Sequence, residues 1–389
     1  MTNRRSIGIA VAVFAVLLVV HGTSAGPWLE DHLSYRLELE GRNLLHHAPP
    51  LDNRIEIVAI PELHPQGLTA HEWSTALASI YAHRPSSVIV EYDFSRSFGD
   101  LEDRGFLAAA AGFPRLMAEV RVIPRKPDEE TASLSSRPEL QLENFFGQVT
   151  TTALRVPWMQ QTFPNLEGPS PRLVSAFRRL GQLEAERLGS LNYVHPLLRI
   201  DDKLALPYMG FYSGQPLTVV GDSLVLGGLE IPLDENGRVP VNLPSAESLT
   251  RATEILSAHP APQELQNLHE GDTVFVVPLP EETSSLPLHQ RITASGGYLP
   301  AAVLSSALTG EWLRPIEAGL PLTFLFCALG LGLALLMSGP RLVLAIAFAA
   351  ISSILGAISA ALALGWMVPW IFPILGLTLT AASVRAARK

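Results

Sequence analysis

The stretch "SVIVEYDF", residues 87–94, places an apolar run directly before two acidic residues, Glu91 and Asp93. A short apolar run that is rich in β-branched residues and ends in polar residues is typical of a buried strand. A helical segment closed by Pro85 precedes this run, and a second one, "FLAAAAG" (106–112), follows it. The order helix, strand, helix predicts an α/β unit built around residues 87–94.

The same alternation continues in both directions along the chain. "RIEIVAI" (54–60) is predicted as a strand before the first helix, and "MAEVRVI" (117–123) as a strand after the second. Thr69 and Glu72 form a capping-box pattern where the first helix begins. Strands that alternate with helices predict an α/β domain with a mixed, largely parallel sheet and flanking helices.

Further elements are expected in the rest of this domain. Residues 124–138 are polar and rich in turn formers, which predicts a loop, and residues 174–188 follow a helical pattern. Short strands and one closing helix are expected at 218–220, 223–226, 239–243, 273–277 and 299–308.

Apolar residues concentrate at the two ends of the 389-residue chain. Residues 7–20 form one uninterrupted run, and three more runs lie at 320–337, 342–364 and 365–384. A transmembrane helix needs about 20 apolar residues, and each of the last three runs is close to that length. We therefore expect three transmembrane helices and a short basic tail within residues 316–389.

The first apolar run has two interpretations. Arg4 and Arg5 precede the run and "HGTSAG" (21–26) follows it, which describes a signal peptide cleaved after a small residue. The alternative is an uncleaved transmembrane helix across residues 1–28, and it is favoured because Trp28 stands where an interfacial anchor is expected.

Basic residues that flank the apolar runs predict the orientation in the membrane. These residues are Arg4, Arg5, Arg341, Arg385, Arg388 and Lys389. The positive-inside rule places them in the cytoplasm, so the chain is expected in the inner cell membrane with residues 29–315 extracytoplasmic. Residues 29–315 contain 22 of the 28 basic residues and 36 of the 37 acidic ones, a formal charge of −14 for the external part. Such a surface repels nucleic acid, so we expect no nucleic-acid partner.

The membrane runs are rich in small residues. "LGLGLALL" (329–336) and "AIAFAAISSILGAISAALALG" (345–365) contain the Gly, Ala and Ser residues that let helices approach closely. The helices are therefore expected to pack with a partner protein, with a second copy of the chain, or with one another as a self-contained anchor. Their spanning cores carry no charged side chain, which argues against ion transport. The only cysteine, Cys327, lies in one of these runs, so the external domain has no disulfide.

Three polar residues are candidates for ligand binding. Glu91 and Asp93 lie where a buried strand ends, and ligands of open α/β sheets bind at such strand ends. Arg199 is a candidate anchor for an anion. The structural alternatives are that Asp93 caps the next turn, that Glu91 is paired within the fold, and that Arg199 closes a salt bridge.

Motifs for metal or cofactor chemistry are weak in this sequence. His71 and Glu72 lack the second histidine of a zinc-binding helix, and His46 and His47 have no neighbouring ligands, so all are interpreted as solvated residues. No nucleotide-binding or kinase signature is present. We expect neither a metal nor a cofactor.

Residues 221–224 spell Gly-Asp-Ser-Leu, the pattern around the nucleophile of GDSL-type esterases. Such an enzyme needs a histidine base, and no aspartate in this chain is followed by histidine three residues later. Gly221 and Asp222 are better explained as turn residues, and Gly227-Gly228 as a hairpin turn. We therefore interpret Ser223 as a structural residue and the chain as a non-enzyme.

Several segments, taken in order, resemble the type-2 CHASE domain, an extracytoplasmic sensory module of cyclases and histidine kinases. The matching segments are "LDNRIEIVAI" (51–60), "IYAHRPSSVIVEYDF" (80–94), "LGSLNYVHPLLRI" (188–200), "LVLGGLEIPLDENGRVPVNLP" (224–244), "GDTVFVVPLP" (271–280) and "SGGYLPAAVLSSALTGEWLRP" (295–315). The resemblance implies one membrane helix, an external α/β domain and three closing membrane helices before a cytoplasmic output domain.

The chain departs from this family pattern in four places. Pro61 replaces the usual acidic residue after the first strand, only Trp73 remains of a Trp-Pro-Arg cluster, and Pro278 replaces the usual glycine. The fourth departure is that no kinase or cyclase follows the last membrane run. The resemblance therefore implies a sensory or accessory subunit that signals through a separate partner protein. A scaffold of a cell-envelope complex is the alternative interpretation, and an esterase is the third.

Overall fold

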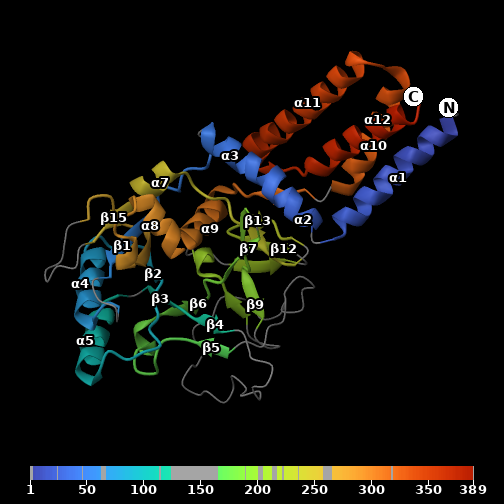
Figure 1. Ribbon diagram of the computed structural model, residues 1–389. Coiled ribbons are helices and arrows are strands. Elements are labelled where there is room, and N and C mark those ends of the chain that lie inside the picture. Colours follow the sequence, from blue (N-terminus) through green and yellow to red (C-terminus); the bar gives the residue numbers. More distant parts are fainter. Residues whose placement is uncertain are drawn as a thin grey trace. The chain divides into compact units, whose positions relative to one another are not determined.

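The computed structural model describes residues 3–23, 25–45, 47–62, 67–113, 115–123, 165–188, 190–199, 205–212, 217–220, 223–234, 236–256, 265–316 and 319–388 (Figure 1). The loop expected at 124–138, His46, Gly221 and Asp222 lie outside these residues. The chain divides into two compact units. The helical unit comprises 1–48, 187–192 and 313–389, and the α/β unit comprises 49–186 and 193–312.

A six-stranded sheet forms the centre of the α/β unit. Its strands follow the spatial order β15-β1-β16-β2-β3-β6, and every neighbouring pair is parallel. The strands are β1 (Ile55–Pro61), β2 (Ser87–Val90), β3 (Leu116–Glu119), β6 (Arg179–Gly181), β15 (Thr253–Ile255) and β16 (Thr273–Leu279). The predicted α/β class with a largely parallel sheet is confirmed.

Helices cover both faces of this sheet (Figure 1). The helices are α4 (Ala70–Tyr81) and α5 (Asp100–Ala110) on one face, and α7 (Ala246–Arg251), α8 (Leu288–Ser295) and α9 (Tyr298–Thr309) on the other. Neighbouring residues of β1 point to opposite faces, so Val58 packs with the first group and Ile57 with the second. Full burial of such side chains contributes roughly 1.5–3 kcal/mol each.

Helix α4 begins where the capping box was predicted. Thr69 Oγ1 accepts a hydrogen bond from the Glu72 backbone N at 3.3 Å, and Glu72 Oε2 accepts one from the Thr69 backbone N at 2.7 Å. These two bonds satisfy backbone donors that a helix leaves unpaired at its start. Trp73 and Ile80 follow on the buried face of α4.

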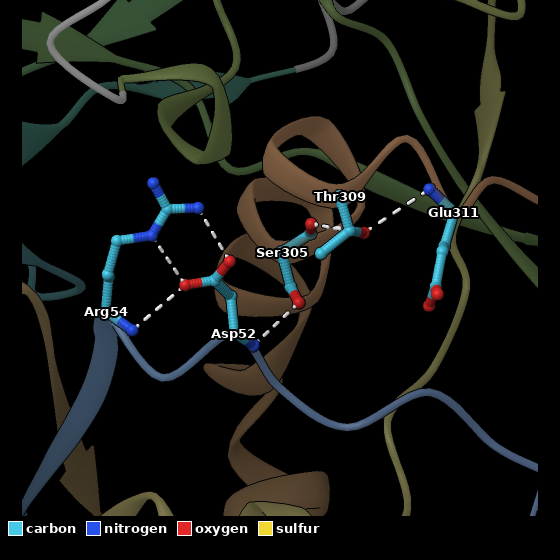
Figure 2. Close-up of polar contacts among 5 residues, drawn as sticks. All are labelled: Asp52, Arg54, Ser305, Thr309 and Glu311. Atoms are coloured by element: carbon cyan, nitrogen blue, oxygen red, sulfur yellow. Dashed lines mark hydrogen bonds and ion pairs between the residues drawn. The ribbon is translucent and has the colours of Figure 1, made fainter.

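Polar contacts fix the segment before β1 against helix α9 (Figure 2). The Asp52 backbone N donates to Ser305 Oγ at 2.9 Å, while the Asp52 carboxylate accepts from Arg54 Nε at 2.8 Å. The Arg54 hydrogen bond lowers the pKa of Asp52 despite partial burial. At the end of α9, Thr309 Oγ1 donates to the Ser305 carbonyl at 2.9 Å and accepts from the Glu311 backbone N at 3.3 Å. The bond from Asp52 to Ser305 thus joins the segment before β1 to α9, while the Thr309 bonds stabilise the end of the helix.

The prediction of a helix at residues 174–188 is wrong. The segment contains a 3-10 turn η4 (Val174–Ala176), strand β6 and strand β7 (Ala185–Leu188). β6 pairs with β3 and becomes the edge strand of the sheet, where a helix could not continue the hydrogen-bond ladder. A Cβ atom on Gly181 would lie 2.6 Å from Met209 Cγ, so β6 is packed closely against the segment that contains Met209. Tertiary pairing therefore overrides the local helical pattern.

Short antiparallel strands form small sheets separate from the six-stranded sheet. They are β4 (Arg121–Ile123) with β5 (Asn165–Glu167), β9 (Leu197–Arg199) with β10 (Ala205–Pro207), β8 (Leu191–Val194) with β14 (Val239–Pro240), and β11 (Leu217–Val220), β12 (Ser223–Leu226) and β13 (Leu229–Ile231) in one group. Gly227 and Gly228 join β12 to β13 with φ of 58° and 92°, which confirms the predicted hairpin turn. The 3-10 turns η5 (Met209–Phe211) and η6 (Glu281–Thr283) complete the described elements of this unit.

The helical unit contains the apolar segments. Its elements are α1 (Asn3–His21), α2 (Ala25–Leu29), the π-helix η1 (Glu30–Tyr35), α3 (Arg36–Leu44), α10 (Gly319–Leu336), α11 (Pro340–Leu364) and α12 (Ile371–Ala386). Three of them, α1, α10 and α11, are long and apolar enough to cross a membrane. Helix α12 is shorter than the run predicted at 365–384, because Trp366–Met367 form strand β18, which pairs with β17 (Arg314–Pro315). Its 16 residues span about 24 Å.

The basic residues gather at one end of the helical unit. Ile9 near the start of α1 packs with Ala334 near the end of α10 and with Val384 near the end of α12. Arg388 Nη1 donates to the Ala334 carbonyl at 3.1 Å. The start of α11, next to Arg341, contributes Ile346 to the same cluster. Helices α10 and α12 therefore run parallel to each other and antiparallel to α1, with the positive charges together.

Candidate functional site

A cleft of about 890 Å³ opens at the carboxyl ends of the parallel strands in the α/β unit. Four residues at or next to the carboxyl ends of these strands line it, namely Glu62, Glu91, Glu119 and Pro278. The chain leaves β1 and β2 toward α4 and α5 on one face, but leaves β16 toward α8 and α9 on the other. Ligands of open α/β sheets bind where the connections diverge in this way.

Acidic side chains outnumber basic ones in this cleft. Five carboxyl groups and two guanidinium groups line it: Glu62, Glu91, Asp93, Glu102 and Glu119, with Arg96 and Arg121. Tyr92 and Phe98 add two aromatic rings, and the Tyr92 ring is held edge-on against Trp73 with centroids 5.0 Å apart. The cleft is therefore polar and acidic, with an aromatic wall.

Glu91 is the most constrained carboxyl group of the cleft. Its backbone N donates to the Val276 carbonyl at 3.1 Å, which fixes the residue beside β16. Its Oε2 atom has no accessible surface and no hydrogen-bond partner among the described residues. A Cβ atom on Gly297 would lie 2.8 Å from this oxygen, so the glycine allows the α8–α9 turn to close over it. Burial raises the pKa of Glu91 to about 8, with a further contribution from Glu119.

Glu119 ends β3 beside Glu91 and has a similar environment. Burial raises its pKa to about 7, the Arg121 charge opposes this effect, and Glu184 and Asp93 add to it. Burial also raises the pKa of Glu62, which follows β1. Glu91 and Glu119 therefore hold their protons to higher pH than an exposed glutamate does.

Asp93 differs from these glutamates because it has partners. Its Oδ1 accepts from the Ser95 backbone N at 2.9 Å, and its Oδ2 accepts from Arg121 Nη1 at 3.0 Å. Partial burial raises its pKa, but the Ser95 hydrogen bonds and the charges of Arg121 and Arg96 prevail and lower it overall. Asp93 thus stays ionised and caps the turn after β2, as the structural alternative predicted.

A buried tyrosine lies within electrostatic range of the two glutamates whose pKa is raised. Tyr208 is 0% exposed, and its hydroxyl group has no hydrogen-bond partner in the described part of the chain. Burial raises its pKa well above 10, and the carboxyl groups of Glu91 and Glu119 add to that shift.

The structure brings together two of the three predicted ligand-binding residues. Glu91 and Asp93 both line the cleft, whereas Arg199 ends β9 and its side chain lies outside what the structure describes. Ser223 begins β12, where its hydroxyl donates to Glu230 on the neighbouring strand rather than to a histidine. His71 is exposed on α4. Across the described ranges, no three His, Cys, Asp or Glu side chains form a group that could hold a metal ion.

Three further cleft residues were not predicted from the sequence: Glu62, Glu119 and Arg121. The first two obey the rule that identified Glu91, since each stands at the end of a parallel strand. Glu62 directly follows Pro61, so an acidic residue does come after the first strand, one position later than the resemblance implies. Tyr208, which is buried within electrostatic range of Glu91 and Glu119, comes from a distant segment, and no local signal identifies it.

Comparisons of the chain with protein-family models, with curated proteins and with solved structures find no match.

Proposed function

We propose that this chain is a membrane-anchored, extracytoplasmic sensory or accessory subunit that signals through a separate partner protein. The observation that carries this proposal is the cleft at the carboxyl edge of the sheet, where Glu91 Oε2 is buried without a partner. An unpaired buried polar atom costs free energy, so a site that retains one is suited to receive a ligand group. The resemblance to the type-2 CHASE domain supports the same interpretation.

The arrangement of the helical unit supports the proposed orientation. Arg4, Arg341 and Arg388 belong to the ends of α1, α11 and α12 that cluster together. The positive-inside rule assigns that end to the cytoplasm and the opposite end, from which the α/β unit is connected, to the outside. In this proposal α12 spans beside α10, where Gly330 and Gly376 permit close packing.

Cysteine labelling tests this orientation. The single native cysteine, Cys327, is buried, so it contributes little background. A membrane-impermeant maleimide applied to intact cells stripped of any outer layer should label Glu247→Cys, an exposed position on α7. The matched variant Ser338→Cys, between α10 and α11, should be labelled only after the membrane is opened. The reverse pattern would overturn the proposal, because the cleft would then face the cytoplasm.

The signalling role has its own test. Deletion of the gene should change the output of a membrane kinase, cyclase or comparable regulator, and the wild-type chain should restore it. If deletion changes no output and the α/β unit binds no ligand, the sensory proposal fails. The scaffold alternative is favoured instead if deletion disperses an envelope complex of fixed stoichiometry.

A further inference from the structure

We propose that the ligand of the cleft is a small organic amine with two or more ammonium groups. This inference rests on the proposed binding function and specifies its ligand class.

The charge balance of the cleft favours a cation. Five carboxyl groups face two guanidinium groups, and both guanidinium groups act on Asp93. Arg121 and Asp93 form the one ion pair found between lining residues within the described ranges. Glu62, Glu91 and Glu119 are left without a paired cation in that part of the chain. An anionic ligand would oppose ionisation of these carboxyl groups, whereas a ligand with two ammonium groups would stabilise their ionised form and neutralise it.

The buried Glu91 carboxyl group provides a second, independent observation. Its Oε2 atom has no accessible surface and no hydrogen-bond partner among the described residues, while the residue itself lines the cleft. An ammonium group has three donors and could occupy the carboxyl acceptors directly.

The aromatic wall selects an organic cation rather than a metal ion. Tyr92 and Phe98 line the same cleft, and a cation within about 6 Å of an aromatic ring face is attracted to it. A metal ion needs several converging ligands, and no suitable group of three exists among the described residues. Alkyl segments between ammonium groups would in turn contact the Phe98 ring.

Proton release should accompany binding, because the ligand charge stabilises the ionised carboxylates. The titratable or charged groups around Glu91 come from several elements: Glu62 after β1, Asp93 and Arg96 after β2, Glu119 in β3, Arg121 in β4, Glu184 before β7, Tyr208 before η5 and Tyr298 in α9. Arg121 opposes protonation of Glu91, and burial and Glu119 promote it. Since the pKa of Glu91 is about 8, affinity should rise on the order of tenfold per pH unit below that value.

The test uses full-length protein in mild detergent at fixed ionic strength and 1,4-diaminobutane as the probe. Isothermal titration calorimetry in buffers of different ionisation enthalpy should show binding with proton release, and affinity should rise between pH 6 and pH 8. Glu91→Gln and Glu119→Gln should each weaken binding at least tenfold, whereas Glu247→Gln, an exposed control on α7, should not change it. Each variant is first checked for an unchanged thermal transition at pH 5.

The outcomes separate the ligand class from the proposed function. Binding of 1,4-diaminobutane that is equal in all variants reflects the general acidity of the surface and overturns the inference. If succinate or 1,4-butanediol binds instead, and Arg96→Gln in the cleft weakens that binding, the amine assignment is wrong while the binding function stands. If cationic, neutral and anionic probes all fail to bind folded protein, the ligand class and the proposed binding function both fall.

Discussion

Replacement of Glu91 by glutamine should stabilise the protein at alkaline pH. In the folded chain burial raises the pKa of Glu91 from 4.5 to about 8. The unfolded chain loses this proton near pH 4.5, while the folded chain keeps it until about pH 8. The folded state therefore binds more protons between these values, and the free energy of unfolding falls as pH rises through that window.

The magnitude follows from the size of the pKa change. A shift from 4.5 to about 8 corresponds to a loss on the order of 3–5 kcal/mol between pH 4.5 and pH 8, and the loss stops above the folded pKa. Glutamine has nearly the same shape and no charge to desolvate. Glu91→Gln should therefore match the wild type at pH 4.5 and exceed its stability by up to that amount at pH 8.

Thermal unfolding of the full-length protein in detergent, recorded at pH 4.5 and pH 8, measures this difference. The melting temperature of Glu91→Gln should exceed that of the wild type only at the higher pH. Glu247→Gln, exposed on α7, should show no pH-dependent difference. Equal or lower stability of Glu91→Gln at pH 8 would contradict the raised pKa, because it would mean that Glu91 is ionised and paired in the folded state.

Five further substitutions, one at a helix cap and two pairs at glycines, test the local physics by the same unfolding assay. Thr69→Ala removes the capping side chain of α4 and should cost about 1 kcal/mol, with no loss expected if the cap is unimportant. Gly297→Ala should destabilise the fold because its Cβ would meet a valine side chain of β16, whereas Gly105→Ala, in open space on α5, should stabilise it by about 1 kcal/mol. Gly330→Ala should loosen the α10–α12 contact, since its Cβ would lie 2.5 Å from a backbone carbonyl of α12, whereas Gly332→Ala has open space and should be neutral or stabilising. Equal behaviour within either glycine pair would contradict the packing described.

The central α/β architecture could be predicted from the sequence because its signals are local. The apolar run before Glu91, the capping box at Thr69 and the glycine pair at 227–228 each specify a strand, a helix start or a turn within a few residues. The two long C-terminal apolar helices were predictable for the same reason, since length and composition alone identify them.

Long-range pairing accounts for what the sequence did not reveal. Residues 179–181 carry a helical pattern, but they pair with β3, and the Gly181 contact with Met209 depends on tertiary packing. The same holds for the last apolar run, where Trp366–Met367 pair with Arg314–Pro315 and shorten the final helix.

The candidate site was predictable only in part. Glu91 and Asp93 follow from the position of strand ends, and the same rule would have identified Glu119. The order of strands in the sheet, which places β16 beside β2, is not visible in the sequence and decides which strand ends share a cleft. Tyr208, which is buried within electrostatic range of Glu91 and Glu119, comes from a segment that bridges to Gln182 after β6, and this contact is equally invisible in the sequence.

The proposed signalling through a partner protein can be tested by purification. The full-length protein is purified from native membranes in mild detergent, and the bound proteins are identified. The proposed sensory or accessory role predicts that a kinase, cyclase or other signalling protein co-purifies in fixed stoichiometry. Gly330→Ala should weaken this association if the membrane helices form the interface, and Gly332→Ala should preserve it. If the chain purifies alone from membranes in which signalling complexes stay intact, the proposed sensory or accessory role is contradicted.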